Sequence, residues 1–160
     1  MQVLLNALTQ LSEYKQLLEA MDAGQCPAAV SGLSAVHRAH FAAAIRRDTQ
    51  RTVVLVCADE GEGDRLARDL SALTGEPVSV LTARAFTFHT GATVSRQWEH
   101  RRLGLLRALH EGQLGVLVAT VEGLLQRTMS PQVLARASFT LRVGGTYDLN
   151  ELAEQLARSG

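Results

Sequence analysis

The sequence has no excess of charge of either sign, because its 160 residues hold 16 lysines and arginines against 16 aspartates and glutamates. Without a net basic field, nothing marks the whole chain as a nucleic-acid binder, although a local basic patch stays possible. Charged residues make up 20% and hydrophobic residues 46% of the chain, a balance typical of a globular protein rather than a disordered one. The length fits a single domain with a core of its own.

Cysteines and long apolar runs are scarce as well. The two cysteines, Cys26 and Cys57, lie in separate apolar stretches, and we expect buried thiols rather than a disulfide or a redox pair. The start of the chain carries Glu13 and Lys15 and lacks the basic segment and cleavage site of a signal peptide. No apolar run approaches the roughly 20 residues that a membrane-spanning helix needs. We therefore expect a soluble, cytoplasmic protein with no membrane partner.

Apolar residues recur along the chain with the periods of helices and strands in alternation. This order predicts an α/β fold, in which a parallel sheet carries helices on both faces. The unbroken apolar runs Val53–Cys57 and Gly115–Ala119 predict central strands that are buried on both faces. Further strands are expected at 27–32, 77–83 and 138–143, and helices at 3–24, 34–47, 62–74, 95–111, 122–129, from 131 onward, and 149–157.

Four strand-to-helix turns are candidate sites, because ligands bind such sheets at the carboxyl ends of the strands. They are residues 31–34, 59–63, 82–93 and 120–123.

The first turn has the layout of a phosphate-binding P-loop, in which a strand, a glycine turn and a helix follow one another. Gly32 is kept, and Ser34 stands near the position of the second glycine. Ala35, however, takes the lysine position, and Val36 takes the position of the magnesium-binding hydroxyl. We expect no tight nucleotide binding at this loop, only the weak anion attraction of a helix N-terminus. An ordinary turn between a strand and a helix is the alternative.

The second turn is acidic, since four carboxylates fall within Asp59–Asp64. Such a cluster could hold magnesium and a phosphoryl group, as in receiver-type domains. Adjacent carboxylates in a turn are more often the solvated start of a helix, where the helix dipole favours acidic residues. His37 and His40 lie three apart on one expected helix, but no further ligand joins them, so no metal site is expected.

The long helix expected at 95–111 is rich in arginine. Arginines can grip a DNA backbone or face the carboxylates of a partner. The alternative is a solvated helix face on which glutamates balance the arginines. The candidate contact residues are Arg96, Arg101, Arg102 and Arg107, and the balancing residues are Glu99 and Glu111.

One long stretch resembles a known family. Residues 85–127, "AFTFHTGATVSRQWEHRRLGLLRALHEGQLGVLVATVEGLLQR", are similar to the N-terminal region of transcription-repair coupling factors (Mfd). The pairs Ser95-Arg96, Glu99-His100 and Arg102-Leu103, with the turn "VLVATVEGLLQR", carry the resemblance. The closing residues, "LRVGGTYDLNELAEQLARSG", are similar to the family's passage into its second subdomain.

The resemblance implies a division of the chain and a non-catalytic role for it. Residues 1–24 would form an N-terminal helix, 25–137 a degenerate RecA-like domain similar to subdomain 1A of UvrB, and 138–160 the start of a UvrA-binding subdomain. Family members release stalled RNA polymerase by translocating on DNA, and they recruit UvrA for excision repair. Their ATP and magnesium are bound by a motor elsewhere, so the resemblance implies no catalytic residue, cofactor or metal in this chain.

Two other function classes stay open beside this one. The first is a receiver-like or other α/β domain that uses the acidic turn at Asp59–Asp64. The second is a RecA-like module of some other helicase that still binds nucleotide.

Overall fold

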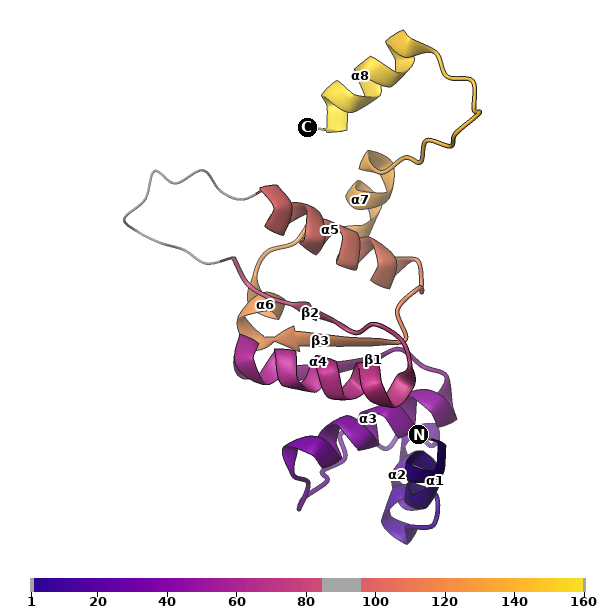
Figure 1. Cartoon of the computed structure of the whole chain (residues 1–160), viewed down its shortest axis with the longest axis vertical. Coiled ribbons are helices and arrows are strands. Elements are labelled where there is room, and N and C mark those ends of the chain that lie inside the picture. Colours follow the sequence, from indigo (N-terminus) through magenta and orange to yellow (C-terminus); the bar gives the residue numbers. More distant parts are fainter. Residues whose placement is uncertain (1, 85–95, 160) are drawn as a thin grey trace, which may run out of the picture.

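The computed structural model describes residues 2–84 and 96–159 of the chain. Over these ranges helices and short strands alternate, and Figure 1 shows the sheet between layers of helices. The elements are α1 (Gln2–Leu8), α2 (Ser12–Asp22), α3 (Ala35–Thr49), β1 (Val53–Cys57), α4 (Glu60–Thr74), β2 (Ser79–Leu81), α5 (Arg96–His110), β3 (Val116–Thr120), α6 (Val121–Leu125), α7 (Pro131–Ala137) and α8 (Leu149–Ser159).

The described strands form one parallel sheet in the order β1-β3-β2. Val53 pairs with Val116 in β3, and Leu81 of β2 pairs with Ala119. All five residues of β3 are buried, as expected for a strand with neighbours on both sides and helices above and below. The predictions of an α/β fold, of parallel pairing and of a central strand at this run are confirmed.

Helices cover both faces of the sheet, so the layered arrangement is also confirmed (Figure 1). On one face α3 and α4 pack against Val116 and Val118, together with side chains of β1. On the other face α5 lays its leucines over Leu81, Leu117 and Ala119. Residues that face the two helix layers alternate along each strand, because successive side chains of a strand point to opposite sides of the sheet.

The prediction that Val53–Cys57 is a central strand with two buried faces is wrong. β1 lies at an edge of the described sheet, and its burial alternates along the strand. Val54 and Val56, which point to the α5 side, are 44% and 54% exposed. The physical reason is that the strand expected at 27–32 does not form, since these residues have no regular structure and are exposed. No described strand therefore pairs with β1 on that edge.

Two other sequence expectations fail at the ends of the chain. Residues 138–143 form no strand and connect α7 to α8 as irregular chain. The single helix expected at 3–24 is broken into α1 and α2, with a tight turn in which the Leu11 amide donates to the Leu8 carbonyl at 3.0 Å. The break lets both helices pack on α3, which one straight helix could not do.

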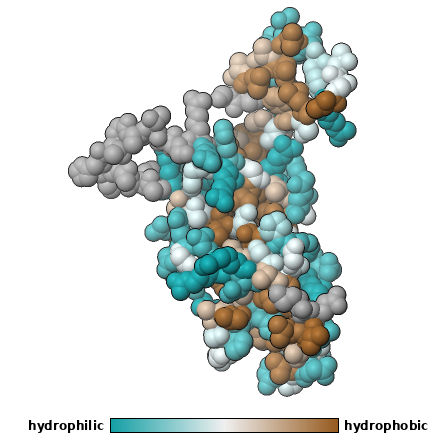
Figure 2. Space-filling view, viewed as in Figure 1, coloured by the Kyte–Doolittle hydropathy of each residue, from teal (hydrophilic) through white to brown (hydrophobic). Residues whose placement is uncertain are grey.

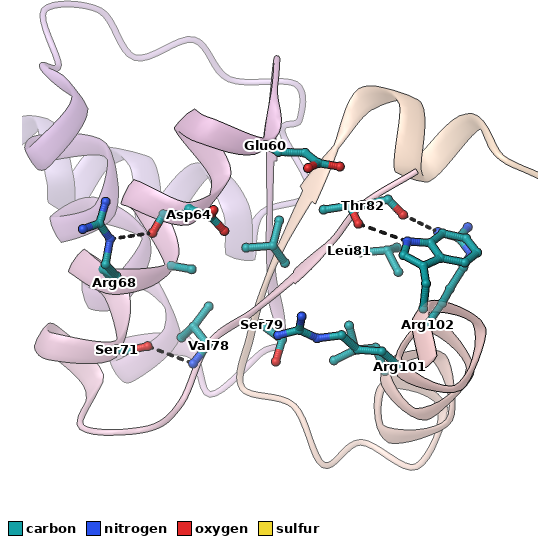
Figure 3. Close-up of a pocket in the computed structure, with 14 residues that line it drawn as sticks. Glu60, Asp64, Arg68, Ser71, Val78, Ser79, Leu81, Thr82, Arg101 and Arg102 are labelled. Carbon is teal, nitrogen blue, oxygen red and sulfur yellow. Dashed lines mark hydrogen bonds between the residues drawn. The ribbon is translucent and has the colours of Figure 1, made fainter. Parts of the chain in front are cut away.

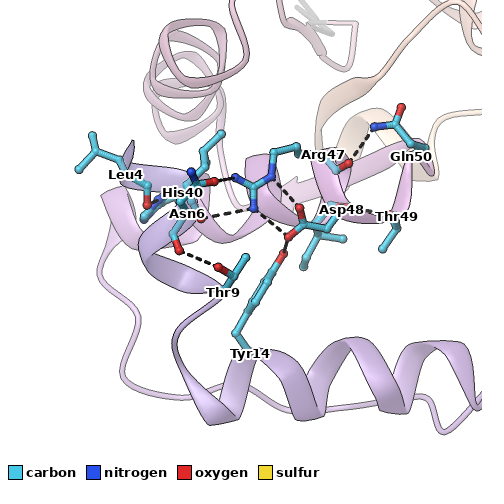
Figure 4. A network of polar contacts seen from close by, with 11 residues as sticks. Leu4, Asn6, Thr9, Tyr14, His40, Arg47, Asp48, Thr49 and Gln50 are labelled. Atoms are coloured by element: carbon cyan, nitrogen blue, oxygen red, sulfur yellow. Dashed lines mark hydrogen bonds and ion pairs between the residues drawn. The ribbon is translucent and has the colours of Figure 1, made fainter. Parts of the chain in front are cut away.

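A polar network with an aromatic contact fastens the N-terminal helices to α3 (Figure 4). The hydroxyl of the fully buried Tyr14 donates to Oδ2 of Asp48 at 2.8 Å, and the Tyr14 ring meets the edge of Phe41 at 5.6 Å between centroids. Arg47 donates to Asp48 and, at 2.9 Å, to Oδ1 of Asn6. Because α1, α2 and α3 share one apolar core as well, these helices form a single packed unit.

The C-terminal helices begin at residues whose side chains cap them. Ser130 accepts from the Val133 amide, and Pro131 occupies the first turn of α7. Asp148 accepts from the amides of Asn150 and Glu151 at the start of α8. This last helix extends away from the sheet and contacts α7, and Figure 2 shows hydrophobic side chains on it at the top of the view. None of the described helices is long and apolar enough to cross a lipid bilayer.

Candidate functional site

The loop that resembles a P-loop precedes α3 but follows no strand. Gly32 has φ of +81°, a left-handed conformation that glycine adopts without strain. Ser34 takes the extended N-cap conformation, yet its side chain makes no capping bond and instead lies 3.1 Å from Nδ1 of His37. A Cβ atom added at Gly32 would meet nothing within 4 Å, so no packing contact requires a glycine at this position.

The start of α3 offers little to a phosphate beyond its own amides. Ala35 and Val36 are exposed and carry neither a charge nor a hydroxyl. The nearest basic side chain on the helix, Arg38, pairs with Glu62 of α4 at 2.8 Å. A triphosphate bound here would lack the lysine and the magnesium ligand that make P-loop binding tight.

The acidic turn at 59–64 serves the start of α4. Oδ1 of Asp59 accepts from the Glu62 amide at 2.8 Å, which is the usual N-cap bond. Glu62 accepts from the Ala58 amide at 3.1 Å and pairs with Arg38. Two of the four carboxylates are thus engaged in capping and in joining α3 to α4. No group of three or more potential metal ligands occurs in the part of the chain that the structure describes.

The side chains of Cys57, His37 and His40 make contacts within the fold. Burial raises the pKa of the Cys57 thiol, and the nearby charges of Glu62 and Asp59 raise it further. A thiol held in its neutral form is a poor nucleophile. The expectation of a buried thiol holds for Cys57, whereas Cys26 is exposed. His40 bonds the Leu4 carbonyl at 2.7 Å, and His37 lies beside Ser34.

Arg102 on α5 is the most enclosed charged side chain of the predicted contact residues, being only 7% exposed. Its guanidinium donates to the carbonyls of Thr82 at 3.1 Å and Gly123 at 2.9 Å, and more weakly to that of Gln126 at 3.4 Å. The same group lies 5.7 Å from the centroid of the Trp98 ring. Burial lowers the pKa of Arg102. This arginine ties the carboxyl end of β2 to α6 and is not free to meet a partner.

The other predicted contact residues on α5 differ from Arg102. Arg101 is exposed, and its contact with DNA or a partner stays a prediction. Arg96 begins the helix, but its side chain lies outside the described residues, as does most of the candidate turn at 82–93. Arg107 pairs with Glu111 at 2.7 Å, in agreement with the balanced helix face that was the alternative reading.

A groove of about 670 Å³ lies between α4 and α5, with β2 as its floor (Figure 3). Glu60, Asp64 and Arg68 stand on the α4 wall, and Trp98 and Arg101 stand on the α5 wall. This volume is in the range of protein ligand pockets, which run to roughly 300–1,000 Å³. Sequence reasoning did not find the groove, because its walls come from separate turns and its floor is a strand of only three residues.

Two glycines that sequence reasoning passed over decide how the helices sit on the sheet. A Cβ atom at Gly63 would come within 3.0 Å of Cγ1 of Val80 and 3.2 Å of Sγ of Cys57, so α4 approaches the sheet closely there. A Cβ atom at Gly123 would collide with the Leu81 carbonyl oxygen. Each glycine follows a strand by a few residues, a position at which close packing of a helix on a sheet calls for glycine.

Comparison with known proteins gives the family to which the chain is similar. It is 27% identical over 155 residues to the transcription-repair-coupling factor of Myxococcus xanthus, a match that covers 92% of the chain. It is 20% identical over 159 residues to the transcription-repair-coupling factor of Bacillus subtilis strain 168, covering 96% of the chain. The chain is similar to transcription-repair coupling factors. The resemblance seen in its sequence is confirmed.

The similarity has a defined extent. The chain spans about 13% of the length of each of these two relatives, while nearly all of its own length is matched. No family profile and no solved structure matches the chain. The comparisons therefore connect the chain to transcription-repair coupling factors, and the RecA-like character of its sheet stays a prediction.

Proposed function

We propose that the chain is a non-catalytic scaffold domain related to transcription-repair coupling factors, built on a degenerate RecA-like sheet and working in the cytoplasm. The observation that carries the proposal is the match to two such factors over more than nine-tenths of the chain. The loop before α3 supports it, since Ala35 and Val36 stand where a nucleotide site needs lysine and a hydroxyl. In the proposal, ATP and magnesium act in a separate motor and not here.

The proposed role is to help recruit UvrA to RNA polymerase that has stalled on DNA. In this role residues 25–137 supply a rigid platform, and 138–160 begin the part that meets UvrA. Support for the division comes from residues 138–148, which form neither a strand nor a helix, and from α8, which contacts α7 rather than the sheet. Leu149 and Leu156 on α8 are exposed, as expected for a helix that packs on further protein.

Of the alternatives, the receiver-like domain has the weaker support. Such a domain needs free carboxylates at the carboxyl ends of the strands to bind magnesium. Asp59 caps α4 and Glu62 pairs with Arg38, so two of the four carboxylates of the acidic turn are engaged in contacts within the fold.

Capture of purified UvrA tests the proposal. The bait proteins are the chain itself and the chain joined to the segment that follows the matched region in the Myxococcus xanthus relative; that segment alone is the control. We expect weak or no capture by the chain and clear capture by the fusion. Equal capture by chain and fusion would place the recruiting surface within residues 1–160, and no capture by either would contradict a role in recruiting UvrA.

A further inference from the structure

The outer edge of β1 carries backbone groups that bond to no other residue. The Val53 amide donates to the Gly115 carbonyl at 3.0 Å, so Val53 and every second residue after it point their backbone groups toward β3. The amides and carbonyls of Val54 and Val56 therefore point away from β3, and they have no partner in the part of the chain that the structure describes. An edge of this kind, without a charge or a proline, can bond to another extended segment.

The segment between α2 and α3, residues 23–34, begins and ends near the two ends of β1; we call it the strap. Asp22, the last residue of α2, pairs with Arg51, which lies just before β1, at 3.5 Å. At the other end, Ala35 begins α3 and lines the same cavity as Asp59, which follows β1. The strap therefore runs from the amino end of β1 toward its carboxyl end, which is the direction of a parallel strand.

The middle of the strap is free to pair. Residues 27–31 are exposed, have no regular structure and make no backbone hydrogen bond within the described ranges. Gly24 and Gly32, with φ of +69° and +81°, place a turn on each side of them. The helix that follows, α3, packs on the face of β1 that holds Val53 and Leu55. A strand at 27–31 would thus be joined to β1 through a helix, which is the usual connection between parallel strands.

We propose that the strap closes on the outer edge of β1, where residues 27–31 become a fourth strand parallel to it. The domain then has two states, the open one of this structure and a closed one in which the sheet gains this strand. The proposal stands on the geometry of the strap and of the β1 edge, and it does not depend on the role in repair.

One parallel register satisfies all four outward-pointing groups of β1. In this register the Val54 amide donates to the Pro27 carbonyl, and the Val54 carbonyl accepts from the Ala29 amide. The Val56 amide donates to the Ala29 carbonyl, and the Val56 carbonyl accepts from the Ser31 amide. Pro27 is needed only as an acceptor, so its missing N–H group loses no bond at the first position of the strand.

The same register brings apolar side chains together. Ala28 lies beside Val54 and Val30 beside Val56, on the face of the sheet that α5 leaves uncovered at β1. Val30 is 46% exposed in the open state, and Val56 is 54% exposed. Closing the strap therefore removes apolar surface of both segments from water.

Amide hydrogen exchange of the full chain, followed by nuclear magnetic resonance, tests the proposal. We expect the amides of Val54, Val56, Ala29 and Ser31 to exchange at least about threefold more slowly than in an unstructured peptide, which corresponds to a closed state about two-thirds populated. Exchange at the unstructured rate at these four amides would overturn the proposal. So would slow exchange at Val54 and Val56 that rises with protein concentration and leaves Ala29 and Ser31 fast, because a second copy of the chain would then occupy the edge.

Two proline variants separate strand pairing from a general ordering of the strap. Ala29→Pro removes the amide that bonds Val54, so Val54, Val56 and Ser31 should exchange at the unstructured rate. Ala28→Pro is the matched control, because the Ala28 amide points away from β1 in the closed state, and it should leave the slow exchange in place. Both residues are exposed and irregular in the open state, so the amides of β3 should be unaffected in either variant. Equal exchange of the two variants at Val54 and Val56 would contradict the proposed register.

Discussion

Replacing Arg102 by alanine should lower the free energy of unfolding more than replacing its exposed neighbour Arg101 does. The guanidinium makes two well-formed hydrogen bonds, to Thr82 and Gly123, and a longer one to Gln126. The Arg102 side chain is only 7% exposed, so these carbonyls lose their charged donor in a region that water reaches poorly. Loss of a bond to a charged group leaves a desolvation cost of about 1–3 kcal/mol for each buried partner. Because the third bond is weak, we expect a total loss of about 3 kcal/mol.

Urea unfolding followed by circular dichroism measures this loss. For a domain of this size, about 3 kcal/mol corresponds to a fall in melting temperature of roughly 6–12 °C. Arg102→Lys should recover only part of it, since an ammonium group cannot reach several fixed carbonyls at once as a guanidinium does. Arg101→Ala is the control, because Arg101 is exposed and its loss should change stability by less than about 0.5 kcal/mol. If the Arg102 and Arg101 variants unfold alike, Arg102 does not join β2 to α6.

Three further outcomes are expected. Gly63→Ala should cost about 1–3 kcal/mol in urea unfolding, since its Cβ would press on Val80; an unchanged midpoint would show that α4 can shift outward. Tyr14→Phe should cost about 1 kcal/mol through the lost bond to Asp48, and a neutral result would contradict the polar anchor of the N-terminal helices. The hydrogen bond from Arg47 lowers the pKa of Asp48 below its unfolded value, so stability present above about pH 4 should be lost as the pH falls through the folded-state pKa. In acid titrations followed by circular dichroism, Asp48→Asn should flatten this dependence, and an unaltered profile would assign the acid sensitivity to other carboxylates.

The strands show what apolar pattern can and cannot predict. The run at 116–120 and the run at 53–57 are alike in length and β-branched content, and both indicate a strand. Pattern alone does not say which of two such strands has a neighbour on each side. That depends on whether residues 27–32 pair beside β1, and in this structure they do not.

Features of the candidate site that depend on neighbouring residues could be predicted from the sequence. Features that depend on tertiary contacts could not. The missing lysine at position 35 and the acidic start of the helix after Asp59 can be predicted from neighbouring residues. Arg101 and Arg102, by contrast, are adjacent in sequence and equally charged, yet one is exposed and the other buried. Their difference comes from the helix period, which turns Arg102 toward carbonyls of β2 and α6 that lie distant in sequence.

Calorimetric titration of the chain with ATP and magnesium tests most directly whether this domain works without nucleotide. Gly32 and the start of α3 keep the glycine turn and the helix of a P-loop without its strand, while Ala35 and Val36 supply neither a positive charge nor a metal-binding hydroxyl. We predict no binding at micromolar concentrations, measured beside an intact P-loop ATPase as the positive control. A dissociation constant below about 10 μM, or roughly −7 kcal/mol, would contradict the proposal of a scaffold domain without nucleotide chemistry.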